Sequence, residues 1–176
     1  MRIQILLVLV FCSRSFGRQV ENGTRIVKRT VSVIEAKCRT LKSTGFQFYQ
    51  RGNTKLCLYL GQDKKNYNDA KIQCTRLNCR LAVINTIEKF NMIAYIVDVW
   101  IGLDDIATEG TFLWADGSYL QQQQINDLFY PGDPNNCCEI RQCCKEDCVC
   151  HRAHGAFDKF IDIPCSYEKS YLCEKT

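Results

Sequence analysis

The chain is 176 residues long and carries a formal net charge of +4 and thirteen cysteines. Its length is enough for one domain with a hydrophobic core and a short additional segment. The charge falls to +2 if Arg2 and Arg14 are removed with the amino-terminal segment. So small a net charge gives no reason to expect a nucleic-acid partner.

Residues 1–17 have the features of a secretory signal peptide. Arg2 supplies the positive start, residues 3–11 are apolar except for Gln4, and Ser15-Phe16-Gly17 offers small residues at a cleavage site. The apolar run is far shorter than the ~20 residues that a membrane-spanning helix needs, and no later stretch replaces it. We therefore expect a secreted, extracellular protein with no transmembrane segment.

Residues 18–44 are predicted to form a leader or stalk ahead of a single domain at 45–176. The leader is polar as far as Thr30 and contains Asn22-Gly23-Thr24, the acceptor pattern for an N-linked glycan. Asn22 is therefore the predicted glycosylation site.

Alternating apolar residues predict a hairpin at the start of the domain. Phe46 and Phe48 share one face, and the strand 56–60 follows. Asn66 is a helix cap, and the apolar residues after it repeat at three- and four-residue spacing. This spacing directs Cys74 into the core.

A second helix is predicted after a short strand at 81–84. Asn85 and Glu88 stand in capping-box spacing at its start, and Phe90 and Ile93 begin its core face. Packing accounts for this helix without any further role.

Two central strands are predicted at 100–103 and 112–114, with the acidic loop 104–110 between them and a turn at Asp116-Gly117. Regular patterning then fades, so that 121–147 would be an unusually long coil for a compact domain.

Five cysteines lie in or beside this long stretch, which favours a functional loop held by ligands over disorder. The four glutamines at 121–124 are predicted to face solvent.

Twelve cysteines remain if Cys12 leaves with the signal peptide, and an even number in an exported chain indicates disulfides. Zinc is the alternative for the cysteines and histidines between 143 and 154, but they lack repeated Cys-x-x-Cys spacing. A hydrolase is disfavoured, because the chain has two histidines, no Gly-x-Ser-x-Gly elbow and no His-Glu-x-x-His helix. We predict a binding protein and not an enzyme.

Oxygen-bearing side chains gather at Asp133-Pro134-Asn135-Asn136, at Glu146-Asp147 and at Asp162. Carboxylate and amide oxygens are the ligands that Ca²⁺ takes, about six to eight of them. With Trp100-Ile101-Gly102-Leu103 upstream, these motifs resemble the C-type lectin-like domain over nearly the whole mature chain. The resemblance implies a disulfide-rich α+β fold in which two helices flank small antiparallel sheets and a long loop binds calcium.

The resemblance also implies disulfides from Cys74 to Cys173 and from Cys148 to Cys165. A bond from Cys38 to Cys57 is the ordinary expectation for the extended form of the domain. The six other cysteines allow 15 connectivities, among which the sequence does not choose. They are Cys79, Cys137, Cys138, Cys143, Cys144 and Cys150.

In sugar-binding members of the family, the positions of Asp133, Asn135, Glu146 and Asp162 hold the calcium ion that two sugar hydroxyls join. The peptide bond before Pro134 is expected to be cis. Asp133 is one methylene shorter than the glutamate of mannose-type sites. Ile161 stands where an asparagine would ligate the ion and donate to a hydroxyl, and an unpaired ligand hydroxyl costs on the order of 1–3 kcal/mol.

A second set of positions matches the residues that hold an auxiliary calcium ion. All five are oxygen donors, and gathered carboxylates would repel each other without a cation, so metal binding and loop ordering should be coupled. Solvated loop charges are the alternative for the first two. The set is Asp105, Glu109, Asn136, Glu146 and Asp147.

The leading hypothesis is a secreted, calcium-dependent lectin that binds glycans or glycoproteins, with a sugar site impaired by Ile161. A disulfide-linked or clustered oligomer would offset weak single-site affinity. The alternative is a protein-binding member of the same fold that uses its cysteine-rich insert, residues 137–144, as a rigid contact surface.

Overall fold

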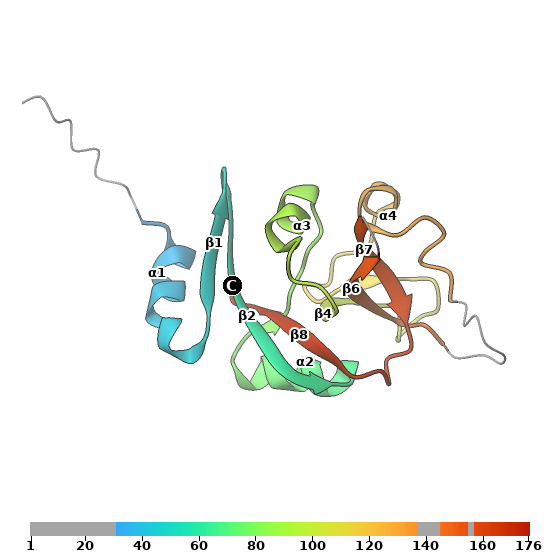
Figure 1. The fold of residues 1–176 in the computed structure, drawn as a ribbon, viewed down its shortest axis with the longest axis horizontal. Coiled ribbons are helices and arrows are strands. Elements are labelled where there is room, and N and C mark those ends of the chain that lie inside the picture. Colours follow the sequence, from blue (N-terminus) through green and yellow to red (C-terminus); the bar gives the residue numbers. More distant parts are fainter. Residues whose placement is uncertain (1–30, 137–144, 155–156) are drawn as a thin grey trace, which may run out of the picture. The chain divides into compact units, whose positions relative to one another are not determined.

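The structure is a computed structural model that describes residues 31–136, 145–154 and 157–176. The predicted signal peptide, Asn22 and the cysteines of 137–144 lie outside the described residues. Figure 1 shows the arrangement of helices and strands. These are α1 (Val33–Thr40), η1 (Lys42–Thr44), β1 (Gln47–Arg51), β2 (Thr54–Lys65), α2 (Tyr67–Arg76), β3 (Arg80–Leu81), α3 (Ile87–Ile93), β4 (Val99–Asp104), β5 (Leu113–Trp114), α4 (Gln122–Leu128), β6 (Cys148–His154), β7 (Phe157–Ile163) and β8 (Lys169–Glu174).

The strands form one mixed sheet in the order β1-β2-β8-β4-β6-β7, with β3 paired to β8 and β5 to β4. The predicted α+β class is confirmed, but the expectation of small, wholly antiparallel sheets is wrong. Strands β4 and β8 run parallel, with Val99 opposite Ser170 and Trp100 opposite Tyr171. This parallel pair joins the amino-terminal hairpin to the strands that carry the predicted calcium residues.

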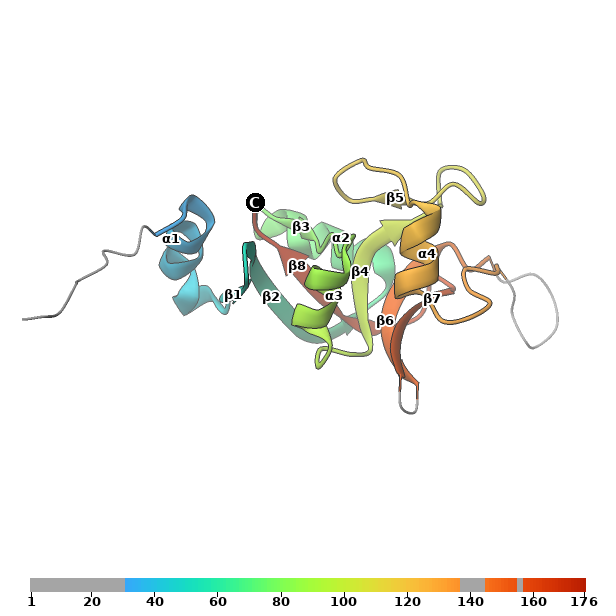
Figure 2. The same cartoon turned by 90° about the horizontal axis from the view of Figure 1, so that it is seen from above.

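Strand β4 is buried on both faces, and its successive side chains point to opposite faces of the sheet. On β4, Val99 and Ile101 enter one apolar cluster together with residues of α3. Trp100, between them, enters a second cluster with Tyr67 of α2. Figure 2, seen from above, shows α3 beside β4 in the middle of the domain, and Figure 1 shows α2 and α3 on opposite sides of the sheet, as this alternation requires.

Helix α2 begins as predicted, because the Asn66 side chain accepts a hydrogen bond from the Asp69 amide at 2.9 Å. Cys74 on this helix is fully buried and bonded to Cys173. At α3 the predicted capping box is wrong by one residue. Thr86, not Asn85, is the N-cap, and its hydroxyl accepts from the Lys89 amide at 3.3 Å.

Helix α4 lies where the sequence analysis expected coil. With α1, in the predicted leader, it brings the α-helices of the described part to four, where two were predicted. Gln124 explains the difference. Its Oε1 accepts from the Gln121 amide at 2.9 Å and from Trp114 Nε1 at 3.3 Å, while its Nε2 donates to Asn85 O at 2.8 Å. The prediction of solvent exposure is therefore wrong for Gln124, which is half-buried and links α4 to two other segments.

Helix α1 falls within the segment predicted as leader. Its N-cap is Ser32, and Cys38 is bonded to Cys57 on β2. Glu35 is buried on the same helix and pairs with Arg39 at 2.8 Å. The compact unit accordingly extends from Val31 to Thr176, which is earlier than the predicted boundary at Gly45.

Gly102 lies at the centre of the sheet, and we expect Gly102→Ala to destabilise the fold by about 1–3 kcal/mol. A Cβ atom there would lie 2.6 Å from Leu81 O and 2.7 Å from Ala115 Cβ, and neither atom belongs to a flexible side chain. Denaturant unfolding measures the loss. The double variant Gly102→Ala/Ala115→Gly should recover part of it, and equal midpoints for Gly102→Ala and the parent would contradict the prediction.

Candidate metal centre

Asp162 on β7 connects the sheet to the segment that follows Pro134. Its Oδ2 accepts hydrogen bonds from the backbone amides of Asn135 and Asn136, both at 2.8 Å. The Asp133–Pro134 peptide bond is cis, as expected. The carboxylate therefore orients the backbone of two predicted ligand residues.

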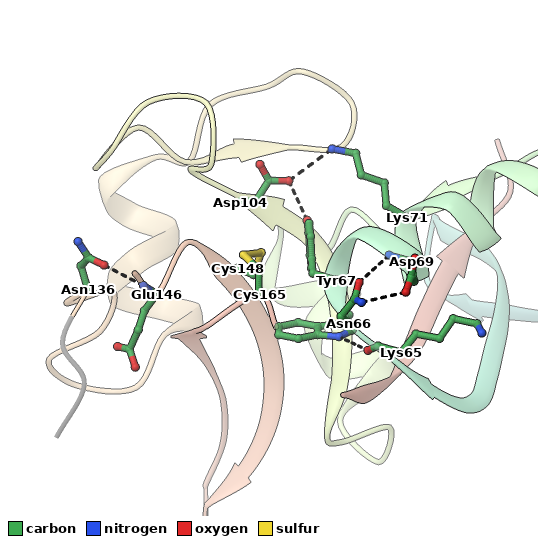
Figure 3. Close-up of a disulfide and its surroundings, with 11 residues drawn as sticks. Lys65, Asn66, Tyr67, Asp69, Lys71, Asp104, Asn136, Glu146, Cys148 and Cys165 are labelled. Carbon is green, nitrogen blue, oxygen red and sulfur yellow. Dashed lines mark hydrogen bonds and ion pairs between the residues drawn. A yellow bond between two sulfur atoms is a disulfide. The ribbon is translucent and has the colours of Figure 1, made fainter. Parts of the chain in front are cut away.

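Asn136 links three segments of the candidate site. Its Nδ2 donates to Glu109 Oε1, and its Oδ1 accepts from the Glu146 amide, both at 2.8 Å. Figure 3 shows the second of these bonds. Three of the five residues predicted for the auxiliary ion are thus connected, although Glu109 and Glu146 lie 37 positions apart in the chain.

Asp105 is the most buried of the predicted auxiliary ligands, with 3% of its surface exposed. Its Oδ2 accepts from the Gly110 amide at 2.8 Å, and its own amide donates to Asp147 O at 3.0 Å. Burial raises the pKa of Asp105 to about 6, and the negative charges of Glu109 and Asp147 add to the effect. The protein therefore holds this carboxylate at an electrostatic cost.

Asp133 is in a similar state at the sugar-proximal position. Burial raises the pKa of Asp133 to about 6, and the nearby charge of Asp162 raises it further, while a hydrogen bond from Asn135 Nδ2 opposes the change. Asp162 itself is buried. Among the described residues, neither Asp162 Oδ1 nor Asp105 Oδ1 has a hydrogen-bond partner, although both atoms are shielded from solvent.

These observations fit a calcium ion. A buried carboxylate oxygen without a partner is costly in a folded protein, and a cation would relieve both the missing contact and the repulsion. No three carboxylates in the described part of the chain bring oxygens within 4.8 Å of one another. Asparagine oxygens, backbone carbonyls or water would therefore have to complete a shell of six to eight ligands.

Ile161 supplies no oxygen to this site. It neighbours Asp162 on β7, so their side chains leave the strand on opposite faces. Ile161 is partly buried and packs against the apolar cluster that contains Trp100 and Cys150. Ile161, which stands where the family pattern has an asparagine, therefore has a packing role here.

Comparison with known protein families matches residues 63–175 to the lectin C-type domain. The chain belongs to this family. The low affinity immunoglobulin epsilon Fc receptor of Mus musculus is 29% identical over 157 residues, covering 85% of this chain and 42% of the receptor. CD209 antigen-like protein C of Mus musculus is 27% identical over 99% of this chain and 93% of its own length.

A solved C-type lectin domain has the same fold. The cow carbohydrate-recognition domain of CD23, crystallised in the presence of a GlcNAc2Man3 oligosaccharide, gives a TM-score of 0.60 at 27% identity over 74% of this chain and 92% of that domain. None of the helices in residues 31–136, 145–154 and 157–176 has the length and apolar character needed to cross a lipid bilayer.

A disulfide underlies the candidate site of this lectin domain. Cys148 at the start of β6 is bonded to Cys165, the pairing that the resemblance implied, and Cys165 O accepts from the Tyr67 amide at 3.0 Å. Asp104 belongs to the same support, because it accepts from the Tyr67 hydroxyl at 2.9 Å and pairs with Lys71 at 3.7 Å (Figure 3). Adjacent acids at 104 and 105 therefore serve different parts of the domain.

A pocket of about 420 Å³ opens beside the candidate ligands of the lectin domain. Its lining includes Asp105, Glu109 and Asp162 together with apolar residues. The sequence analysis missed the apolar part of this lining, because Tyr119 and Ile125 come from a stretch without clear strand or helix periodicity. Its residues are Phe112, Tyr119, Leu120, Ile125 and Pro134.

Proposed function

We propose that this C-type lectin domain protein recognises carbohydrate through calcium. Asp133, Asn135, Glu146 and Asp162 hold the sugar-proximal ion, and Asp105, Glu109, Asn136 and Asp147 share Glu146 in holding the auxiliary ion. The observation that carries the proposal is that two buried carboxylate oxygens, Asp105 Oδ1 and Asp162 Oδ1, have no hydrogen-bond partner among residues 31–136, 145–154 and 157–176.

Different residues of the chain have different roles in the proposed binding. Asp162 orients the backbone of Asn135 and Asn136, and the side chains of Asp133 and Asn135 lie close enough to hydrogen-bond. A bound calcium ion would supply direct coordination of sugar hydroxyls. Carboxylates around it would accept hydrogen bonds from the sugar hydroxyls, and amide groups would donate hydrogen bonds to the hydroxyl oxygens. None of these roles requires a nucleophile or a general base, so the protein binds and does not catalyse.

The oligosaccharide named with the cow CD23 domain supports glycans or glycoproteins as the ligand class. Secretion, removal of residues 1–17 and glycosylation at Asn22 belong to the same proposal. Weak single-site binding would favour clustered sites, and a disulfide-linked oligomer is one way to cluster them.

Glycan-array binding tests the proposal. Oxidised protein spanning Arg18 to Thr176 should bind a defined sugar class in calcium and lose the signal in a chelator. Protein that is folded and calcium-loaded but binds no glycan would contradict carbohydrate recognition and leave the metal sites intact.

We expect Ile161→Asn to strengthen sugar binding about tenfold, because the new amide can donate to a ligand hydroxyl that otherwise lacks a partner. Position 161 directly precedes Asp162, whose carboxylate accepts from the amides of Asn135 and Asn136, so the change is made one residue from the candidate ligands. Titration with the best array sugar measures the gain.

Ile161→Leu is the matched control, since it changes shape without adding an amide. Equal sugar affinities for the Asn and Leu variants would count against the assigned role of position 161.

The packing of Ile161 favours a second candidate function, recognition of a protein ligand. A half-buried isoleucine in place of an amide reduces what the site can offer to a sugar. On this alternative the cysteine-rich insert provides the contact surface, and crosslinks would lower the entropy lost on docking. Ile161→Asn should then leave ligand binding unchanged.

A further inference from the structure

Three cysteine sulfurs meet where α2 ends and β8 runs beside it. Cys74 and Cys173 are bonded to each other, and Cys79 is a free thiol in the described structure. The three sulfur atoms all lie within 4.8 Å of one another. This cluster lies outside the candidate calcium site, and the proposed function makes no use of it.

The chain holds Cys79 close to the disulfide through its backbone. Both the amide and the thiol of Cys79 donate to Cys74 O, each at 3.0 Å. Two residues further on, β3 pairs with β8, with Leu81 opposite Cys173. Cys79 therefore lies between the two elements that the disulfide joins, and it is half-buried while both bonded cysteines are fully buried.

We propose that Cys74, Cys79 and Cys173 form a thiol–disulfide exchange site in which Cys79 displaces Cys74 from its bond with Cys173. The Cys79 thiol gives up its proton, and its sulfur attacks the Cys173 sulfur. A Cys79–Cys173 bond forms as the Cys74–Cys173 bond breaks, and the Cys74 sulfur leaves with the bonding electron pair and takes up a proton. One disulfide and one thiol are present before and after, so no oxidant or reductant is needed.

The Cys79–Cys173 bond is the product that the fold favours. The Cys74–Cys173 bridge spans 99 residues, and the new bridge would span five fewer, so both crosslinks restrict the unfolded chain almost equally. A Cys74–Cys79 bond would close a loop of only five residues and would leave no disulfide between β8 and the segment 74–79. Attack on Cys173 keeps one disulfide between this segment and β8.

The exchange is slow at neutral pH, because burial raises the pKa of Cys79 to about 11 and the positive charge of Lys175 only partly opposes this. The thiolate, which is the attacking species, is then a small fraction of the population. Protein prepared under mildly alkaline conditions should therefore contain both bonded forms.

Peptide mapping of the intact oxidised protein tests this directly, because trypsin cuts after Lys71, Arg76 and Arg80 and separates Cys74 from Cys79. After incubation at alkaline pH, acid quenching and alkylation, we expect peptide 77–80 bonded to peptide 170–175, together with alkylated peptide 72–76. Cys150→Ser is the control, since it removes the other free thiol of the described structure and should leave the product fraction unchanged. Cys79 found alkylated at every time point, or bonded to any cysteine other than Cys173, would overturn the proposal.

A second variant tests the same bond at equilibrium. In Cys74→Ser we expect Cys79 bonded to Cys173, with a melting temperature above that of Cys74→Ser/Cys79→Ser. Folded Cys74→Ser protein with free thiols at both 79 and 173 would contradict the exchange site. If Cys74→Ser does not fold, peptide mapping of the parent decides.

Discussion

Replacing Asp162 with asparagine should weaken calcium binding about 100-fold or more, while the calcium-free protein loses no stability. Removing a full negative charge next to a divalent cation costs at least ~2.7 kcal/mol of binding free energy, which corresponds to that factor. The amide oxygen of the introduced side chain would still accept from Asn135 N and Asn136 N, which the carboxylate now does at 2.8 Å.

The charge of Asp162 also raises the pKa of Asp133, which shows that the two carboxylates repel each other in the calcium-free protein. In chelator, the Asp162→Asn substitution should therefore relieve the repulsion between the two carboxylates. In calcium, it should reduce the stability that the bound ion gives to the fold. Calorimetric calcium titration and thermal unfolding with and without chelator measure the two effects.

Two further variants separate the effect of the charge from the effect of the hydrogen bonds to the backbone. Asp162→Ala should lose calcium affinity and also about 1–3 kcal/mol of stability in chelator, because two backbone amides lose their acceptor. Asp63→Asn is the matched charge control, since Asp63 lies on β2 with Lys65 and Tyr171 as its partners, and it should bind calcium like the parent. Unchanged calcium affinity in Asp162→Asn would show that Asp162 is not a calcium ligand.

Removing the Cys148–Cys165 disulfide with two alanines should cost about 3 kcal/mol of stability and weaken calcium binding about tenfold. The bridge closes a separation of 17 residues, for which the chain-entropy model gives roughly this stability. It also restrains the β6–β7 pair where Val149 lies opposite Asp162, and Asp147, whose carbonyl accepts from the Asp105 amide, directly precedes Cys148. Denaturant unfolding and calcium titration separate the two losses.

The domain offers a closely matched control in Cys38→Ala/Cys57→Ala. That bridge spans 19 residues, so its removal should cost nearly the same stability, but it joins α1 to β2 and touches no candidate ligand. Its calcium affinity should equal that of the parent. Equal losses of calcium affinity in the two double variants would attribute the effect to global destabilisation and not to the support of the site.

Helix α2 could be predicted from local sequence alone. Asn66 satisfies the Asp69 amide three residues later, and the residues that face the core repeat at helical spacing. Both signals lie within one short stretch, so no distant partner was needed to recognise the helix or the inward direction of Cys74.

Helix α4 shows the opposite case. Its start has one local signal, a capping box in which the Gln124 side chain accepts from the Gln121 amide, but the run Gln121–Gln124 has no apolar periodicity. Gln124 also contacts Trp114 and Asn85 O, and these hydrogen bonds to distant residues leave no local pattern. Helix α1, in the segment predicted as leader, is likewise linked to a distant element, because Cys38 is bonded to Cys57 on β2.

Residue order was sufficient to predict the class of fold, because spacing, capping residues and oxygen-bearing side chains are local properties that can be compared with a family. The two sets of candidate ligands stay a prediction. The role of each carboxylate, in contrast, depends on the packing around it. Asp104 and Asp105 are adjacent, yet Asp104 binds Tyr67 while Asp105 keeps a buried oxygen without a partner in the described structure. Neighbouring residues at the end of a strand point in different directions, and the elements packed on each side determine whether a charge is neutralised or left for a cation.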